Sequence, residues 1–201
     1  MPFQAVFFDL GGVIVRTEYE APRQHLAERL GMEYEELTRA VFDSETARKA
    51  SVGAITEQEH WTAVMQKLGR PAGDLEPLRT EFFGGDTVDL LLVDFIRGLR
   101  PRLKTGLISN AWDGLRPYIL GQKFDDAFDF MLISAEVGVA KPEARIFHLA
   151  LEKAGVSANE AIFVDDMPEN VESARALGMS GILFRDREST LAQLSGLLKK
   201  M

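Results

Sequence analysis

The chain contains no cysteine. This absence excludes disulfide bonds, thiolate catalysis, iron–sulfur clusters and zinc sites built on cysteine. It fits a reducing compartment, and we expect a cytoplasmic protein. Only three histidines occur, His25, His60 and His148, and no two are close enough in sequence to predict a local metal pair.

Long apolar runs are also absent, so no membrane-spanning segment is predicted. The N-terminus lacks the basic start of a signal peptide, and Asp9 interrupts its apolar stretch. The P-loop, GxGxxG, GxSxG and HExxH patterns are missing. Basic residues are few, with 23 Lys and Arg against 31 Asp and Glu, which gives a net charge of −8. We therefore expect no nucleic-acid partner and no membrane partner.

The remaining composition is that of a folded protein, with 201 residues of which 46% are hydrophobic. That length suffices for one domain, or for one domain carrying an insertion. An apolar run of β type, Val6-Phe7-Phe8, comes first. Residues 16–83 then show helical spacing, as at Leu26 and Leu30, and no strand-like run.

After Gly84-Gly85 the pattern changes to alternating strands and helices. This alternation predicts an α/β fold with a doubly wound parallel sheet. Residues 1–15 and 86–201 are expected to form this core, and residues 16–85 a helical cap inserted after the first strand. The predicted strands cover 103–108, 128–133, 161–164 and 181–184, and the predicted helices cover 87–99, a stretch from 112, 142–154, 168–177 and 191–199.

Polar residues follow several of the predicted strands, where the ligands of such sheets usually bind. They are Asp9, the pair Ser109-Asn110 and the pair Asp165-Asp166. Three carboxylates converging on one crevice repel one another unless a cation is present, and oxygen ligands suit Mg²⁺.

Lys141 precedes Pro142, which we expect to be the first helical residue. Lysine is not a preferred residue at the cap position that this implies, so its charge is available to carboxylates or to a phosphate oxygen.

Each of these residues also has a purely structural interpretation. Asp9 can start a turn, and Asn110 can cap a helix. Asp166 followed by Glu169 has the spacing of a capping box.

Four segments together resemble the motifs of the haloacid dehalogenase superfamily, in the same order and with similar spacing. They are Phe8-Asp9-Leu10-Gly11-Gly12-Val13, Ile108-Ser109-Asn110, Lys141-Pro142, and Phe163-Val164-Asp165-Asp166 followed by Pro168-Glu169-Asn170-Val171. The resemblance covers essentially the whole chain, and the helical insertion matches the subclass with a helical cap.

This resemblance implies a Mg²⁺-dependent phosphatase in which Asp9 is the nucleophile and forms an aspartyl-phosphate. Mg²⁺ would bind Asp9, the Gly11 carbonyl and Asp166, with Asp165 beside it. Ser109 and Asn110 would donate hydrogen bonds to the phosphoryl group, and Lys141 would offset negative charge on it and on Asp9.

The sequence departs from the phosphatase pattern at Gly11, where the family typically carries an aspartate that acts as general acid and base. Losing such a group typically costs 10²- to 10⁴-fold in rate. Three interpretations follow. The first is a phosphatase whose substrate leaves easily, such as an anomeric sugar phosphate or an acyl phosphate, or whose cap supplies the acid. The second is a metal-independent 2-haloacid dehalogenase. The third is a non-catalytic binding protein.

The cap is expected to select a small phosphorylated metabolite. Arg16, Arg48 and Lys49 are candidates for binding a second anionic group, although solvated surface charge is the simpler interpretation. Trp112 either lines the pocket or serves in packing. We expect a monomer or a weak homodimer.

Overall fold

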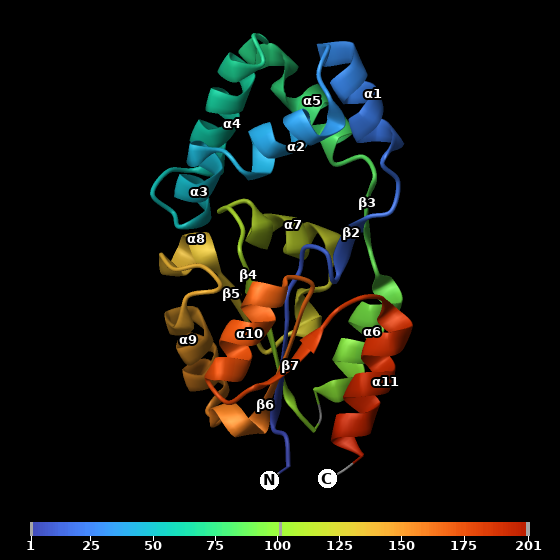
Figure 1. The fold of residues 1–201 in the computed structure, drawn as a ribbon, viewed down its shortest axis with the longest axis vertical. Helices are drawn as coiled ribbons and strands as arrows, with labels where there is room; N and C mark the ends of the chain where they lie inside the picture. Colours follow the sequence, from blue (N-terminus) through green and yellow to red (C-terminus); the bar gives the residue numbers. More distant parts are fainter. Residues whose placement is uncertain (1, 101, 200–201) are drawn as a thin grey trace.

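A computed structural model describes residues 2–100 and 102–199. Its centre is a five-stranded parallel sheet in the order β5-β4-β1-β6-β7. The predicted α/β fold with a doubly wound sheet is confirmed (Figure 1). The strands are β1 (Ala5–Phe8), β4 (Lys104–Ser109), β5 (Phe130–Ile133), β6 (Ala161–Asp165) and β7 (Ser180–Leu183).

The central strand β1 is buried on both faces, as expected for a strand covered by helices on both sides. Val6 and Phe8 point into one apolar layer, and Ala5 and Phe7 into the other. The first layer contains residues of α6 (Leu90–Leu99), α7 (Leu115–Gln122) and α11 (Arg187–Leu198), and the second contains residues of α9 (Ala144–Ala154) and α10 (Pro168–Ala176). Short helices α8 (Ser134–Val137), η2 (Asp125–Ala127) and η3 (Ala158–Glu160) complete this part.

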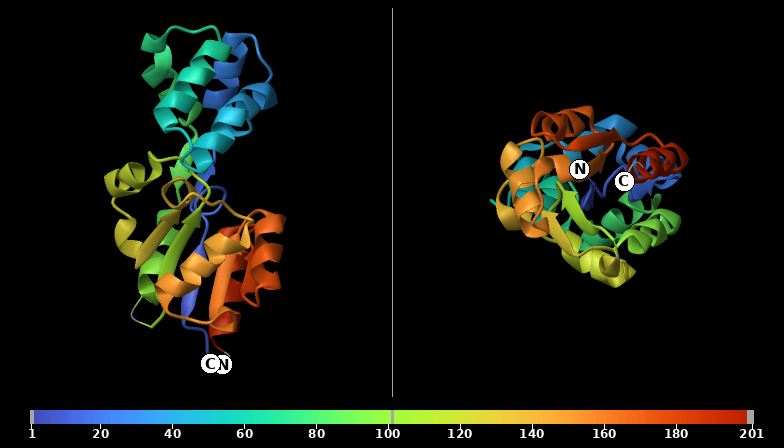
Figure 2. Two further views of the ribbon diagram at one scale, coloured as in Figure 1. Left: turned by 90° about the vertical axis from the view of Figure 1, so that its left-hand side faces the viewer. Right: turned by 90° about the horizontal axis from the view of Figure 1, so that it is seen from below.

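Five helices between β2 and β3 pack at one end of the sheet, opposite the two chain ends (Figures 1 and 2). They surround a separate apolar cluster centred on Trp61 and Phe82, both of which are fully buried. The helices are α1 (Ala21–Leu30), α2 (Tyr34–Phe42), α3 (Glu45–Ser51), α4 (Glu57–Lys67) and α5 (Leu75–Phe82), with η1 (Ala72–Asp74) before α5. We call residues 16–85 the cap and keep the division into cap and core as a prediction.

The connection between cap and core differs from the sequence-based expectation. A two-stranded antiparallel ribbon, β2 (Val15–Thr17) with β3 (Asp86–Val88), joins them. Three-residue strands are too short to give a periodic signal, so β2 was missed and β3 was assigned to the following helix. Asp89 accepts a hydrogen bond from the Leu92 N–H and caps α6, which begins at Leu90.

One further expectation and two alternative structural interpretations about helix ends are wrong. Helix α9 begins at Ala144 with Glu143 as its N-cap, so Lys141 lies outside the helix. Helix α7 begins at Leu115, so Asn110 caps no helix. Met167 is the N-cap of α10, and no side-chain capping bond forms there, which excludes the capping box at Asp166. Within the described part of the chain, no helix combines the length and apolarity needed to cross a membrane.

Candidate active site

The candidate site lies at the carboxyl ends of β1, β4 and β6. Asp9 directly follows β1, and the pairing of Phe8 with Val164 brings it level with Asp165 at the end of β6. Its N–H donates to the Val164 carbonyl at 2.9 Å, which fixes the backbone there. Asp9 is 7% exposed, so its carboxylate has lost most of its contact with water.

Lys141 holds two of these carboxylates together. Its Nζ lies 2.7 Å from Asp9 Oδ1 and 2.6 Å from Asp165 Oδ2, and its ammonium group is buried. One cation between two buried anions compensates only part of their charge. Lys141 therefore acts inside the cluster, although the loop that carries it precedes α9.

Asp165 is fully buried and has donors on both oxygens. Its Oδ1 accepts a hydrogen bond from the Met167 N–H at 2.8 Å, and Asn170 Nδ2 lies 3.0 and 3.1 Å from the two oxygens. With Lys141 on Oδ2, its hydrogen-bonding capacity is largely used. Asp165 is therefore better suited to orienting Lys141 than to binding a metal ion directly.

Burial and the surplus of negative charge raise the pKa of two carboxyls in this cluster. Burial raises the pKa of Asp9 to about 7, and the Asp165 charge adds to the rise while Lys141 opposes it. Burial and the neighbouring Asp165 also raise the pKa of Asp166. Three carboxylates face one ammonium, so the cluster lacks positive charge.

A divalent cation fits this cluster. One carboxylate oxygen from each of Asp9, Asp165 and Asp166 lies within 4.8 Å of the others. Hard oxygen donors in this number, leaving room for water, match what Mg²⁺ prefers. Since Asp165 is already bonded, Asp9 and Asp166 are the better candidates for direct ligands, and the Gly11 carbonyl is the third predicted one.

The two glycines after Asp9 differ. Gly12 has φ of 76°, and a Cβ at this position would overlap the Asp166 carboxylate. Only glycine satisfies both conditions, so Gly12 allows Asp166 to approach the turn. Gly11 has no positive φ, and a Cβ there would meet no atom within 4 Å. The position of the missing general acid is therefore sterically open.

Asn110 contacts Lys141 through its side-chain amide. Its Nδ2 donates to the Lys141 carbonyl at 2.8 Å, and its Oδ1 accepts from the Lys141 N–H at 2.8 Å. These two bonds hold the backbone that carries the ammonium, and one amide hydrogen is left for a ligand. Ser109, the last residue of β4, is buried next to it.

Asn170 lies in the fourth motif, but the sequence predicted no role for it. The structure places it on the buried side of α10, with its amide on Asp165. The helical spacing could have indicated this role, because Val171 and Ala174 of the same helix are buried and Asn170 is a polar residue on the same side.

The basic candidates in and near the cap all have acidic partners. Arg16 pairs with Asp89 and Glu18, Arg48 with Asp43, and Lys49 with Glu45. Their structural interpretation is therefore favoured over a second anion site. Trp112 packs into the cap, where its Nε1–H donates to the Ala47 carbonyl at 3.3 Å.

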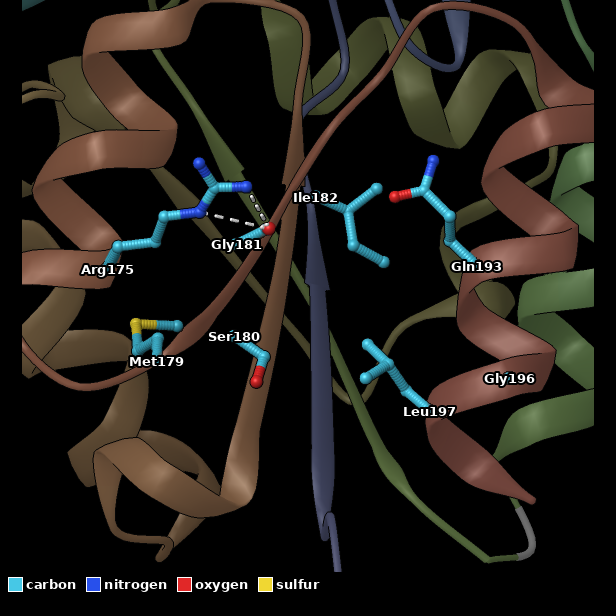
Figure 3. A pocket seen from close by; sticks show the side chains of 8 residues that line it. All are labelled: Arg175, Met179, Ser180, Gly181, Ile182, Gln193, Gly196 and Leu197. Carbon is cyan, nitrogen blue, oxygen red and sulfur yellow. Dashed lines mark hydrogen bonds between the residues drawn. The ribbon is translucent and has the colours of Figure 1, made fainter. Parts of the chain in front are cut away.

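A groove of about 490 Å³ lies elsewhere, along the outer edge of β7 (Figure 3). Arg175 and Met179 stand on one side of the strand, and Gln193 and Leu197 of α11 on the other (Figure 3). The Arg175 guanidinium donates to the Gly181 carbonyl and so covers part of the open strand edge. None of the predicted site residues lines this groove, and the chemistry of the strand ends identifies the site better than cavity size does.

Comparison with known proteins gives a family match over most of the chain. Residues 3–178 match the family described as haloacid dehalogenase-like hydrolase. The chain is similar to the rat bifunctional epoxide hydrolase 2, at 25% identity over 96% of the chain, but it spans only 38% of that protein. It is also similar to the sesquiterpene phosphatase astK of Aspergillus oryzae, with 26% identity over 98% of this chain and 97% of that one.

A third relative is the D-ribitol-5-phosphate phosphatase of Bacteroides thetaiotaomicron, at 26% identity over 86% of this chain and 87% of that one. Among solved structures, a family enzyme from Bacteroides thetaiotaomicron in complex with magnesium and inorganic phosphate superposes with a TM-score of 0.80. It shares 23% identity, and the match covers 94% of this chain and 98% of that one. This likeness concerns the fold.

Proposed function

Because the chain belongs to the haloacid dehalogenase-like hydrolase family, we propose that it is a Mg²⁺-dependent phosphatase of a small phosphate monoester, with Asp9 as the nucleophile. The observation that carries the proposal is the cluster of three carboxylates, of which Asp9 and Asp165 are buried and paired with Lys141 and Asp166 is partly exposed. The relatives named as phosphatases support the same reaction class.

In this reaction an Asp9 oxygen attacks phosphorus, the ester P–O bond breaks, and the organic group leaves as an alkoxide that must gain a proton. A water molecule then attacks the aspartyl-phosphate, which releases inorganic phosphate and restores Asp9. Lys141 Nζ lies 2.7 Å from Asp9 Oδ1, where it favours the ionised form of the carboxyl and holds that oxygen in place. Asp165, Asn170 and Asn110 fix Lys141 from the other side.

Mg²⁺ held by Asp9, Asp166 and the Gly11 carbonyl would supply positive charge to the phosphoryl oxygens. Asp165 would remain the partner of Lys141. Ser109 and the remaining amide hydrogen of Asn110 would donate to the phosphoryl group. These assignments give each predicted residue a role that its contacts allow.

Gly11 limits the reaction, since it has no side chain to protonate the leaving group. A phosphatase built this way favours substrates whose leaving group needs little protonation, or it takes the proton from water. The three-carboxylate cluster counts against metal-independent dehalogenation, since three carboxylates balanced only by Lys141 repel a halocarboxylate substrate when no further cation is bound.

The test is release of phosphate from p-nitrophenyl phosphate and acetyl phosphate with and without Mg²⁺. We expect turnover that stops in excess EDTA, and beryllofluoride bound at Asp9 as a phosphoryl mimic. Halide release from 2-chloropropionate without metal would instead establish a dehalogenase. Inactivity in both assays with a retained ligand would establish a binding protein.

A further inference from the structure

The surface of the cap that faces the site is formed by α3 and the segments flanking it. Trp112 donates to the Ala47 carbonyl, and the Glu57 N–H donates to Asp113 Oδ1 at 2.8 Å. Gly53 approaches the Ala135 carbonyl so closely that a Cβ would overlap it. The lower side of the cap therefore rests on the loops that follow β4 and β5 (Figures 1 and 2).

Several hydrogen-bonding side chains near this surface have partners within the cap, although the buried Nε2 of His60 has none among the described residues. The pairs are Ser44 with the Ala47 N–H, Thr46 with His60, Arg48 with Asp43, and Lys49 with Glu45. The large apolar side chains there remain exposed, with Phe42 at 47% and Val52 at 36%. The cap thus offers carbon surface to the site and few unsatisfied polar groups.

The core contributes apolar side chains next to the polar site. Trp112 follows Asn110 by two residues and stacks against Phe42, with ring centroids 6.0 Å apart and an interplanar angle of 25°. Met167 follows Asp166 directly, is 44% exposed, and bonds to Asp165 through its N–H. Trp112 is therefore carried by the loop whose Asn110 holds the Lys141 backbone, and Met167 by the loop whose backbone bonds to Asp165.

We propose that the substrate is the monophosphate ester of an apolar alcohol, and that its hydrocarbon part lies against Phe42, Trp112 and Met167. This inference rests on the proposed phosphatase. Hydrocarbon surface gains free energy when it leaves water against such side chains. A polyol would lose hydrogen bonds to water there without replacement. A second phosphate would meet Arg48 and Lys49 only after displacing their carboxylates.

The first experiment compares esters of similar reactivity. With Mg²⁺ present, we expect kcat/KM for octyl phosphate to exceed that for glycerol phosphate and ribitol 5-phosphate by about tenfold or more. Octylphosphonate, which cannot be hydrolysed, should compete more tightly than methylphosphonate by a similar factor. The phosphonate comparison measures binding separately from chemistry.

Variants then locate the hydrocarbon. Phe42→Ser and Met167→Ser should each raise KM for octyl phosphate several-fold and should lower kcat/KM for octyl phosphate several-fold more than kcat/KM for acetyl phosphate. Phe42→Leu should restore most of the loss. Leu91→Ser, which changes a 63% exposed residue of α6, is the matched control and should alter neither substrate.

Equal or better turnover of the polyol phosphates would overturn the inference. So would a parallel loss on octyl phosphate and acetyl phosphate in both folded serine variants, because it would show a structural role for these side chains. If the wild type releases phosphate from none of the compounds, including acetyl phosphate, the proposed phosphatase itself is wrong, and the apolar subsite falls with it.

Discussion

Two clusters of charged side chains lie at the two ends of the segment that connects β1 to the cap, one at Asp9 and the other at Arg16. The site cluster contains Asp9, Asp165 and Asp166 around the single cation Lys141. The hinge cluster is built around one buried carboxylate, Asp89, whose oxygens lie 2.9 Å from Arg16 and 2.7 Å from Arg187, and Arg16 also pairs with the more exposed Glu18. The buried carboxylate of the hinge cluster therefore has two cations, whereas the site cluster has one cation for three carboxylates.

The acidity of the carboxyls follows this balance. Burial alone would raise the pKa of Asp89, but hydrogen bonds from Arg16, the Leu92 N–H and Arg187 outweigh it, so the pKa is lowered. At the site, burial raises the pKa of Asp9 by more than Lys141 lowers it, so the pKa is about 7. A carboxylate that is fully paired with arginines, such as Asp89, joins parts of the fold. Carboxylates that outnumber the nearby cations, as at the site, favour the binding of a metal ion from solution.

The strongest test of this comparison is to replace aspartate by asparagine in both clusters. Asp9→Asn should abolish turnover, by 10⁴-fold or more, because an amide is a poor nucleophile. Asp89→Asn should lower stability and leave kcat within about twofold. Phosphate release and urea unfolding with both variants measure this, and substantial activity in a verified Asp9→Asn preparation would refute the nucleophile assignment.

Asn170→Ala should have the next largest effect, since it removes the amide that lies on both oxygens of Asp165. Without it, Asp165 holds Lys141 less firmly, and we expect kcat to fall 10- to 100-fold with KM nearly unchanged. Steady-state kinetics with acetyl phosphate measure it. Glu172→Ala, at an exposed position of α10, is the control; an equally inactive control would assign the loss to the helix as a whole.

The strands and the polar residues at their ends were predictable from the sequence, because apolar runs followed by acids and amides mark the carboxyl edge of a parallel sheet. Asp9, Asn110, Lys141 and Asp165 indeed come together. The sequence does not contain the direction of each bond. Nothing in it indicated that Asn110 would face the Lys141 backbone, since that contact depends on how two loops meet.

The elements that were missed are those stabilised by tertiary contacts. The β2–β3 ribbon has three residues per strand, too few for a periodic signal, and its partners are 69 or more residues apart. Likewise, Trp112 packs into the cap cluster and contacts His60 at a centroid distance of 4.5 Å, a contact between segments distant in sequence. The interpretation of Trp112 as a packing residue agrees with this placement.

Gly11→Asp sharpens the comparison by adding an acid where the site lacks one. The backbone has no positive φ there and the space is open, so the variant should fold. We expect turnover of alkyl phosphates to rise about tenfold or more and that of acetyl phosphate to change little, because only the alkoxide needs a proton. Equal losses on both substrates in a folded variant would mean that another group already acts as the acid.

The two clusters should also respond differently to pH. Because the folded-state pKa of Asp9 is raised to about 7 from an ordinary value of 3.8, the folded state holds a proton that the unfolded chain has released between these values. The stability of the metal-free protein should therefore fall as pH rises from about 4 to 7 through this group.

Urea unfolding in EDTA at pH 5 and pH 7.5 tests this prediction. The Asp9→Asn variant should show a smaller decrease than the wild type, and Mg²⁺ should restore stability at the higher pH by binding the folded state. An identical pH dependence in variant and wild type would show that Asp9 is ionised throughout this range.

The smallest effect is expected for Arg187→Gln in the hinge cluster. The Arg187 side chain is 39% exposed, and its removal leaves Asp89 with Arg16 and the Leu92 N–H. A half-exposed ion pair contributes about 1 kcal/mol or less to the free energy of unfolding. Urea unfolding should register that loss, and kcat/KM should stay at the wild-type value, since no site residue contacts Arg187 among the hydrogen bonds of the described residues. A clear loss of kcat/KM in a folded variant would mean that the hinge cluster positions the cap during turnover. The hinge cluster would then contribute to the reaction as well as to the stability of the fold.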